Sequence, residues 1–208
     1  MQKQLVTIIT SYSVILIFLL SLLNCDNQTN NHIDLSTADH IEKKIDSVLD
    51  LMYLNEKIGQ LVQYSGKWNA TGPSSSKHDQ YKLDKLKKGE VGSMLNVTSV
   101  ASIRETQKII MENSRLKIPL IFAYDVIHGY KTIFPIPLGE TASWDLNIIE
   151  KTARIAAKEA AASGLNWTFA PMMDISRDAR WGRVMEGAGE DPYLNSVVGV
   201  TRIKGFQG

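Results

Sequence analysis

Short apolar segments alternate with helical segments along most of this chain, and this alternation constrains the fold more than any other feature. Residues 91–97, 118–125 and 166–174 are apolar runs bounded by turn residues, as is typical of β-strands that are covered on both faces. Between them, residues 99–114 and 145–164 repeat apolar residues at helical spacing. Strands that are joined by helices lie parallel in one sheet. The sequence therefore predicts an α/β fold with about three strand–helix units.

Local signals predict further elements around these units. Residues 36–52 carry apolar residues at helical spacing, and a second short helix is expected over residues 55–64. Residues 65–78 have the composition of a loop. Gly164 is a typical stop for the preceding helix, and Asp191–Pro192 is a typical start for a following one.

Two architectures fit parallel strands with helical crossovers: an open, doubly wound sheet and a (β/α) barrel. A dinucleotide-binding sheet carries the pattern G-x-G-x-x-G after its first strand, and the turn after residues 91–97 lacks it. The barrel is therefore favoured. A complete barrel has eight units in about 250 residues. Residues 36–208 are accordingly expected to form the N-terminal part of a TIM-type (β/α)8 barrel, incomplete at about three units.

The first 35 residues differ from the rest of the chain. One lysine precedes an apolar run from Leu5 to Leu23, which predicts a secretory signal peptide over residues 1–24 and is also long enough for an uncleaved membrane anchor. Cys25, the single cysteine, follows "SLLN", which resembles a bacterial lipobox except that Asn24 replaces a small residue. Cys25 is therefore the candidate lipidation site and membrane attachment point, ahead of a polar tether over residues 25–35. We expect an exported bacterial protein, either periplasmic or an outer-membrane lipoprotein.

Charge and histidine spacing argue against several classes of partner. The formal net charge is +1 and no long block of one sign occurs, so nucleic acid and acidic membrane surfaces are not favoured. There is no phosphate-binding loop. No metal site is expected, because no ligand spacing links the four histidines, which are His32, His40, His78 and His128.

Polar residues gather where two of the predicted strands end. Asp125 closes residues 118–125 and Asp174 closes residues 166–174, so both acids are expected on the same rim of the sheet. The loops that follow add basic and aromatic side chains: Lys131, Arg177, Arg180, Arg183, Tyr130, Phe134, Trp144 and Trp181. Carboxylates, cationic donors and aromatic faces together are typical of a sugar-binding site. A salt-rich surface loop is the alternative interpretation.

Three stretches resemble one known family in their order and spacing. They are "EKIGQLVQ" (56–63), "YDVIHGYKTIFPIPLGETASWDL" (124–146) and "NWTFAPMMDISRDARWGRVMEGAGEDPYL" (166–194). Together they resemble the N-terminal barrel domain of family-3 glycoside hydrolases of the periplasmic β-glucosidase type, and the resemblance runs over about residues 36–208. It implies an exo-acting, retaining hydrolase of β-linked glucosides or oligosaccharides that needs no cofactor.

The resemblance also implies roles for individual residues. Asp125 would accept hydroxyls of the terminal, non-reducing sugar, and Arg183 corresponds to a sugar-binding arginine. Lys131 stands where the family often has an arginine, which keeps the charge and loses the planar fork. Other charged residues look like the scaffold of the loop: Arg177, Asp178, Arg180, Glu190 and Asp191.

Three further residues are weaker candidates. Glu186 is a candidate partner behind the sugar-binding residues, and Trp181 either covers the sugar or fills the space below the loop. His128 is better explained as a hydrogen-bonded structural histidine than as a sugar ligand.

The spacing of the acids and the resemblance disagree about catalysis. A retaining glycosidase needs two carboxyl groups about 5 Å apart, and Asp125 with Asp174 would be the natural pair. The family instead takes its nucleophile from a strand late in the barrel and its acid/base from a further region. The resemblance therefore implies that Asp125 binds sugar and that both catalytic groups lie beyond residue 208. The chain is then the N-terminal fragment of a β-glucosidase-like hydrolase. A non-catalytic, exported sugar-binding module is the alternative.

Overall fold

The computed structural model describes residues 35–66 and 76–208, with side chains over residues 38–66 and 80–208. The chain divides into two compact units, Met1–Leu51 and Met52–Gly208. The described part of the first unit is helix α2 (Leu35–Leu51), which confirms the helix predicted over residues 36–52. The predicted signal peptide, the tether and Cys25 lie outside the described residues. Within those residues, every helix is too short or too polar to cross a membrane.

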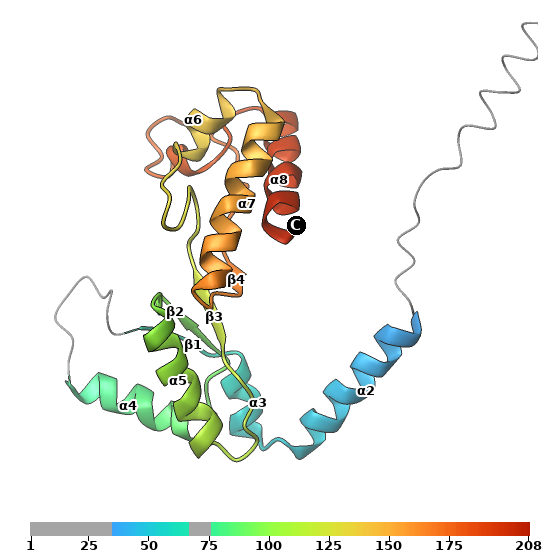
Figure 1. Cartoon of the computed structure of the whole chain (residues 1–208), viewed down its shortest axis with the longest axis vertical. Helices are drawn as coiled ribbons and strands as arrows, with labels where there is room; N and C mark the ends of the chain where they lie inside the picture. The colour runs from blue at the N-terminus through green and yellow to red at the C-terminus, as the bar shows by residue number, and fades with distance from the viewer. Residues whose placement is uncertain (1–34, 67–75) are drawn as a thin grey trace, which may run out of the picture. The chain divides into compact units, whose positions relative to one another are not determined.

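The second unit is built on a parallel sheet of four strands (Figure 1). The strands pair side by side in chain order: β1 (Gln63–Ser65), β2 (Ser93–Leu95), β3 (Ile121–Tyr124) and β4 (Trp167–Thr168). Helices connect each strand to the next: α4 (Ser76–Lys87), α5 (Val100–Asn113) and α7 (Leu146–Ala162), with α8 (Pro192–Gln207) after β4. The predicted α/β class with helical crossovers is therefore confirmed. In the described residues the sheet is open at β1 and β4, and closure into a barrel stays a prediction.

The structure contains one strand more than the sequence predicted. The short helix expected over residues 55–64 ends at Gln60 (α3, Leu54–Gln60), and Gln63–Ser65 forms β1 instead. The carbonyl of Val62 accepts a hydrogen bond from Gly92 at 3.1 Å, next to the ladder between β1 and β2. Residues 63–65 therefore form a strand rather than the end of a helix, although the apolar residues of this segment have helical spacing. Their backbone groups find hydrogen-bond partners in β2, as backbone groups inside a fold must.

The predicted strand over residues 166–174 is much shorter in the structure. Only Trp167–Thr168 pairs with β3, and the chain then runs on without ladder hydrogen bonds. Pro171 lacks the N–H group that a continued ladder would need. The segment between β4 and Asp174 is therefore irregular, and contacts other than sheet pairing must hold it.

The helix boundaries follow their local signals. Asp145 caps α7 by accepting hydrogen bonds from the backbone N–H groups of Asn147 and Ile148. Asp191 caps α8 in the same way through the N–H of Leu194. At the end of α7, Gly164 has a φ of +96°, a conformation that favours glycine and turns the chain back toward β4. The predicted stop at Gly164 and the predicted start at Asp191–Pro192 are confirmed.

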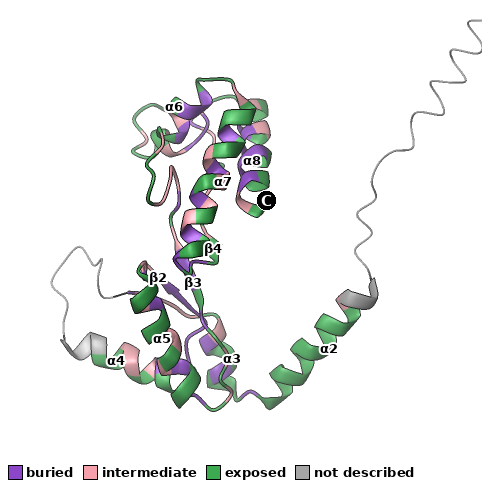
Figure 2. Cartoon of the chain, in the orientation of Figure 1, coloured by how far each residue is buried: buried purple, intermediate pink, exposed green. Residues whose placement is uncertain are grey.

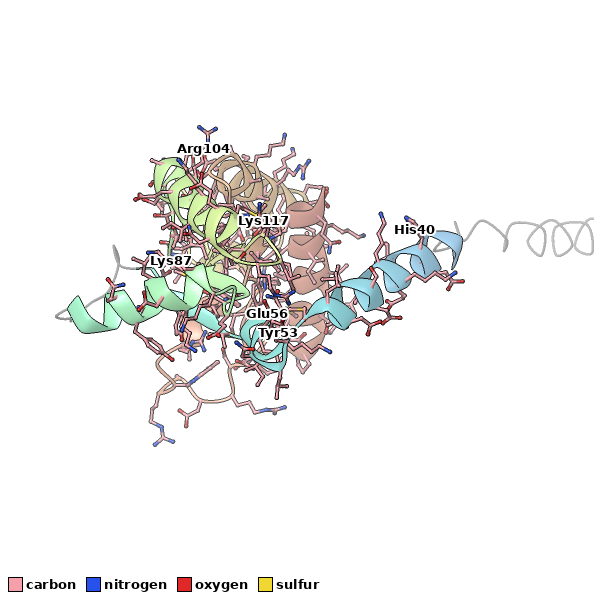
Figure 3. All side chains as sticks on the ribbon, turned by 90° about the horizontal axis from the view of Figure 1, so that it is seen from below. His40, Tyr53, Glu56, Lys87, Arg104 and Lys117 are labelled. Atoms are coloured by element: carbon pink, nitrogen blue, oxygen red, sulfur yellow. The ribbon has the colours of Figure 1, made fainter. Side chains whose placement is uncertain are left out.

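The first turn of α3 is fixed to the chain that follows α5. This contact lies at the end of the sheet where the strands begin, opposite the end where Asp125 follows β3. The Glu56 carboxylate accepts hydrogen bonds from the backbone N–H of Tyr53 at 2.8 Å and from Arg115 Nη2 at 2.6 Å. The Arg115 guanidinium also lies 4.3 Å from the centre of the Tyr53 ring. Figure 3 shows Tyr53 and Glu56 next to each other at the start of α3. The hydrogen bond from Arg115 lowers the pKa of Glu56, against the opposing effect of burial.

Two clusters of buried apolar residues make up the core of the second unit. The larger one lies between the sheet and α4, α5 and α7 and includes Val91, Ile103, Ile110, Phe122 and Leu165. The smaller one contains Ile149 of α7, Val198 of α8 and Ala188 of the loop before α8. In Figure 2 the buried residues of α7 and α8 lie along the sides on which the two helices meet. The second cluster therefore fixes this helix pair to the loop that follows β4.

Candidate functional site

Asp125 and the segment that leads to Asp174 leave the same end of the sheet. Asp125 directly follows β3, and β4 is its parallel neighbour, with Tyr124 opposite Thr168. The Asp125 side chain is exposed, and in the described residues it has no hydrogen bond or ion pair. An ionised carboxylate that is exposed and unpaired can accept hydrogen bonds from a ligand.

Arg183 is held in place by Glu186. Arg183 Nε donates to Glu186 Oε1 at 2.9 Å and Nη2 donates to Oε2 at 2.7 Å, across the short 3₁₀ turn η2 (Val184–Glu186). Such a two-bond pair fixes the plane of the guanidinium. In the described part of the chain Nη1 has no hydrogen-bond partner, so its two N–H groups are available to a ligand. The structure thus places Glu186 directly behind Arg183.

The two acids and Arg183 share one electrostatic environment. The pKa of Arg183 is raised, first by the hydrogen bonds to Glu186 and by its charge, and further by the charges of Asp174 and Asp125. The same pair lowers the pKa of Glu186. The structure therefore brings Asp125, Asp174 and Arg183 close enough to interact, as the parallel arrangement of β3 and β4 predicts.

The loop that carries Lys131 is fixed through its backbone. Glu159 of α7 accepts hydrogen bonds from the N–H groups of Lys131 and Thr132, both at 2.8 Å, and from the Thr132 hydroxyl at 2.6 Å. These bonds, led by the one from the Thr132 hydroxyl, lower the pKa of Glu159. The Lys131 ammonium lies 6.0 Å from the Tyr130 ring centre. In the described residues no contact joins Lys131 to Asp125 or Arg183, so the structure does not bring these three together directly.

His128 closes this loop. Its Nδ1 lies 3.0 Å from the carbonyl oxygen of Phe134, and its own carbonyl accepts a hydrogen bond from the Phe134 N–H at 2.8 Å. Gly129 has a φ of +117°, and a Cβ there would lie 1.9 Å from the Thr132 carbonyl oxygen, so the turn requires glycine. These contacts agree with the interpretation of His128 as a hydrogen-bonded structural residue.

The loop after β4 shows the predicted charged scaffold only in part. Its charges pair only locally: Arg180 and Asp178 form a two-bond pair in which the side chains are 91% and 50% exposed. Exposed pairs of this kind contribute little to stability. The loop is closed instead by a backbone hydrogen bond of 3.0 Å from Ser176 to Gly189.

The other predicted loop residues play smaller parts. Asp191 caps α8, while Arg177 and Glu190 have no ion pair in the described residues. Trp181 is half-buried, and its N–H and carbonyl close successive turns with Asp178 and Val184. The structure shows no ring contact for Trp181 in the described part of the chain.

Sequence reasoning missed the buried polar residues beneath the site. Arg202 of α8 is 4% exposed and forms an ion pair with Glu140 of α6 (Pro137–Thr141), and Asn195 of α8 is 2% exposed. The available signal was the presence of Asn195 and Arg202 on the same helix face as the core residue Val198. A polar residue on an apolar helix face indicates a partner inside the fold.

One groove of the structure lies away from Asp125 and Arg183. It has a volume of about 420 Å³ between the starts of α7 and α8, and most of its lining is apolar, with Trp144, Leu146, Ile149 and Tyr193 among its members. Neither Asp125 nor Arg183 lines it. The groove is therefore separate from the surface that carries Asp125 and Arg183.

Comparisons with known proteins agree on one family. Residues 53–208 match the model of the glycosyl hydrolase family 3 N-terminal domain. The periplasmic beta-glucosidase of Salmonella typhimurium is 46% identical over 164 residues, which are 79% of this chain and 20% of that protein. The lysosomal beta glucosidase of Dictyostelium discoideum is 30% identical over 186 residues, covering 79% of this chain and 22% of its own length.

A solved structure gives the same result. The beta-glucosidase of Listeria innocua in complex with glucose has a TM-score of 0.70 and 40% identity, over 80% of this chain and 24% of that one. The chain thus spans 20% to 24% of the length of the relatives that it matches here. On the match over residues 53–208, this chain belongs to glycosyl hydrolase family 3, within the N-terminal domain of that family.

Proposed function

We propose that this chain is the N-terminal part of an exported β-glucosidase-type hydrolase and that Asp125, Arg183 and Lys131 bind the terminal glucose of a β-linked substrate. The observation that carries the proposal is the unpaired Asp125 carboxylate beside an arginine that Glu186 already orients. The relatives support it, since one is named a periplasmic beta-glucosidase and one solved structure contains glucose. A further Listeria innocua structure contains laminaribiose.

The chemistry of the site suits a pyranose. Asp125 can accept hydrogen bonds from two adjacent hydroxyls, while the N–H groups of Arg183 Nη1 donate to a neighbouring sugar oxygen. Lys131 adds a positive charge from the loop after β3, and Trp181 is a weaker candidate for covering a sugar face. These residues bind and orient. The proposal assigns the nucleophile and the acid/base of a retaining mechanism to residues beyond 208, and it includes export, with Cys25 as the lipidation site.

A hybrid enzyme tests the proposal. Residues 53–208 replace the matching segment of the Listeria innocua enzyme, and hydrolysis of an aryl β-glucoside is measured with and without Asp125→Ala. The Asp125→Ala variant would lose two charge-assisted hydrogen bonds to the sugar, each of about 1.5–3 kcal/mol. This loss corresponds to a fall in kcat/KM of about 10²- to 10⁴-fold.

The control is Glu112→Gln, which removes an exposed carboxylate whose one ion-pair partner among the described residues is Lys108 on α5. This variant should keep its activity. An active hybrid in which Asp125→Ala changes kcat/KM no more than Glu112→Gln would remove Asp125 from the site. The unmodified 208-residue chain is expected to hydrolyse nothing, and turnover by the purified chain would contradict the placement of the catalytic groups beyond residue 208.

A further inference from the structure

We propose that Asn195 and Arg202 of α8 are positioning residues that hold the loops after β3 and β4 at a fixed spacing, so that Asp125 and Arg183 can contact one sugar. The inference rests on the proposed function for the sugar itself. The arrangement of the two loops stands on contacts within the second unit alone.

Arg202 holds the loop after β3. Its Nη2 donates to the backbone carbonyl of Ile127, two residues after Asp125, while Nη1 forms the ion pair with Glu140. Glu140 in turn accepts a hydrogen bond from Thr152 of α7. The guanidinium is therefore fixed between α6, α7 and the segment that carries Asp125.

Asn195 holds the segment after β4. Its Nδ2 donates to the carbonyl of Met173 at 2.8 Å and approaches the carbonyl of Asp174 at 3.4 Å. This segment has left the sheet and lacks ladder hydrogen bonds, so Asn195 replaces part of the support that a longer strand would have had. The same segment leads, through the Ser176–Gly189 bond, into the loop that carries Arg183.

Both donors lie on one face of one helix. Asn195 and Arg202 are seven residues apart in α8, which is two turns or about 10.5 Å along the axis. Each donates to backbone carbonyls, so the contact fixes the path of a loop and not the identity of its side chains. The helix is itself packed closely on α7, where a Cβ at Gly205 would lie 2.5 Å from the carbonyl oxygen of Glu150. A rigid helix with two fixed donors sets the distance between two loops.

Stability alone does not explain the choice of these residues. The Nε of Arg202 is buried without a partner in the described residues, and burial lowers the pKa of Arg202. A buried ion pair can usually be replaced by apolar residues of similar volume without loss of stability. Its contribution here is therefore the placement of Ile127, and through it of Asp125.

The test uses the 208-residue chain with two kinds of replacement. Asn195→Leu keeps the volume of the side chain and removes the donor to Met173. Glu140→Leu combined with Arg202→Met replaces the buried pair by apolar groups, so this double variant should fold even if Asn195→Leu does not. Ile110→Ala, in the core near the opposite end of the sheet, is a control for lost stability without loss of a loop contact.

Two readouts are taken well below the unfolding temperature of each variant. Native-state amide exchange should become about tenfold faster over residues 174–183 in Asn195→Leu and over residues 126–131 in the double variant, with little change in Ile110→Ala. Glucose binding, measured by calorimetry, should weaken about tenfold in both positioning variants, as for the loss of one hydrogen bond to a charged group. The control should bind as the unchanged chain does.

The outcomes separate this inference from the proposed function. If the unchanged chain binds glucose and the folded variants bind equally well, the positioning role is wrong. If the unchanged chain binds no glucose, the hybrid enzyme decides on the proposed function, and amide exchange decides on the loops alone. Exchange that matches the unchanged chain would then overturn the inference, and faster exchange confined to the two loops would uphold it.

Discussion

Removing one partner of the ion pair between Glu140 and Arg202 should strongly destabilise the second unit, and Glu140→Leu is the sharpest way to test this. Both side chains are 4% exposed. Removing the carboxylate leaves a charged guanidinium inside the fold with the Ile127 carbonyl as its remaining acceptor, because its Nε has no partner in the described residues. Burying a charge without its counter-ion is among the few changes that cost several kcal/mol.

The expected magnitude follows from burial. Breaking one side of a pair this deeply buried costs about 3–5 kcal/mol. In a domain of 150 to 250 residues, each kcal/mol lowers Tm by about 2–4 °C, so Tm should fall by about 6–20 °C. Arg202→Met should cost a similar amount, since it leaves the Glu140 carboxylate buried with Thr152 as its donor. The two replacements together should be close to neutral, because neither charge is then stranded.

The assay is a double-mutant cycle by urea unfolding of the 208-residue chain. Each single variant should lower the unfolding free energy by several kcal/mol with an unchanged m-value, and the double variant should recover most of it. A loss below about 1 kcal/mol in Glu140→Leu would show that water reaches the pair. Simple additivity of the two losses would show that the residues do not act as a pair.

Two further predictions concern Glu56 and Asp191. The pKa of Glu56 is lowered mainly by its hydrogen bond from Arg115, so the stability that Glu56 contributes should be complete above the ordinary pKa of about 4.5 and be lost as pH falls through the lower, folded-state pKa. Glu56→Gln should flatten that part of the stability–pH curve, and an unchanged curve would contradict the lowered pKa of Glu56. Asp191→Ala removes the acceptor for the Leu194 N–H at the start of α8 and should cost about 1 kcal/mol by urea unfolding, whereas Asp191→Asn should cost far less.

The elements that the sequence predicted well are those with local causes. Gly164 and Asp191 act within a few residues of the helix ends that they define, so their effect can be predicted from the neighbouring residues in the sequence. β1 is the opposite case, since it is three residues long and exists through its pairing with β2. The strand over residues 166–174 was overestimated for a related reason: an apolar run shows burial but does not show where ladder hydrogen bonds stop.

The site divides in the same way. The strand ends predicted that Asp125 and Asp174 share a rim, and the shared electrostatic environment of both acids with Arg183 agrees with that arrangement. The resemblance to a family suggested Glu186 as a partner without saying which residue it holds. The contacts of Asn195 and Arg202 could not be predicted, because they end on backbone carbonyls, which every residue has and no sequence pattern distinguishes.

Lys131 and Arg183 differ in how firmly their side chains are held, and this difference decides which of them can bind a sugar hydroxyl in a fixed direction. Its loop is fixed at the backbone by Glu159 and by the turn at Gly129, yet its side chain is exposed and carries a point charge on a flexible stem. Arg183 has the opposite character, since Glu186 fixes the plane of its guanidinium and leaves one nitrogen free in the described residues. Directional recognition of a hydroxyl can therefore come from Arg183 and Asp125, while Lys131 contributes mainly charge. Because direction depends on position to within a fraction of an ångström, the buried donors of α8 bear on Asp125 and Arg183 more than on Lys131.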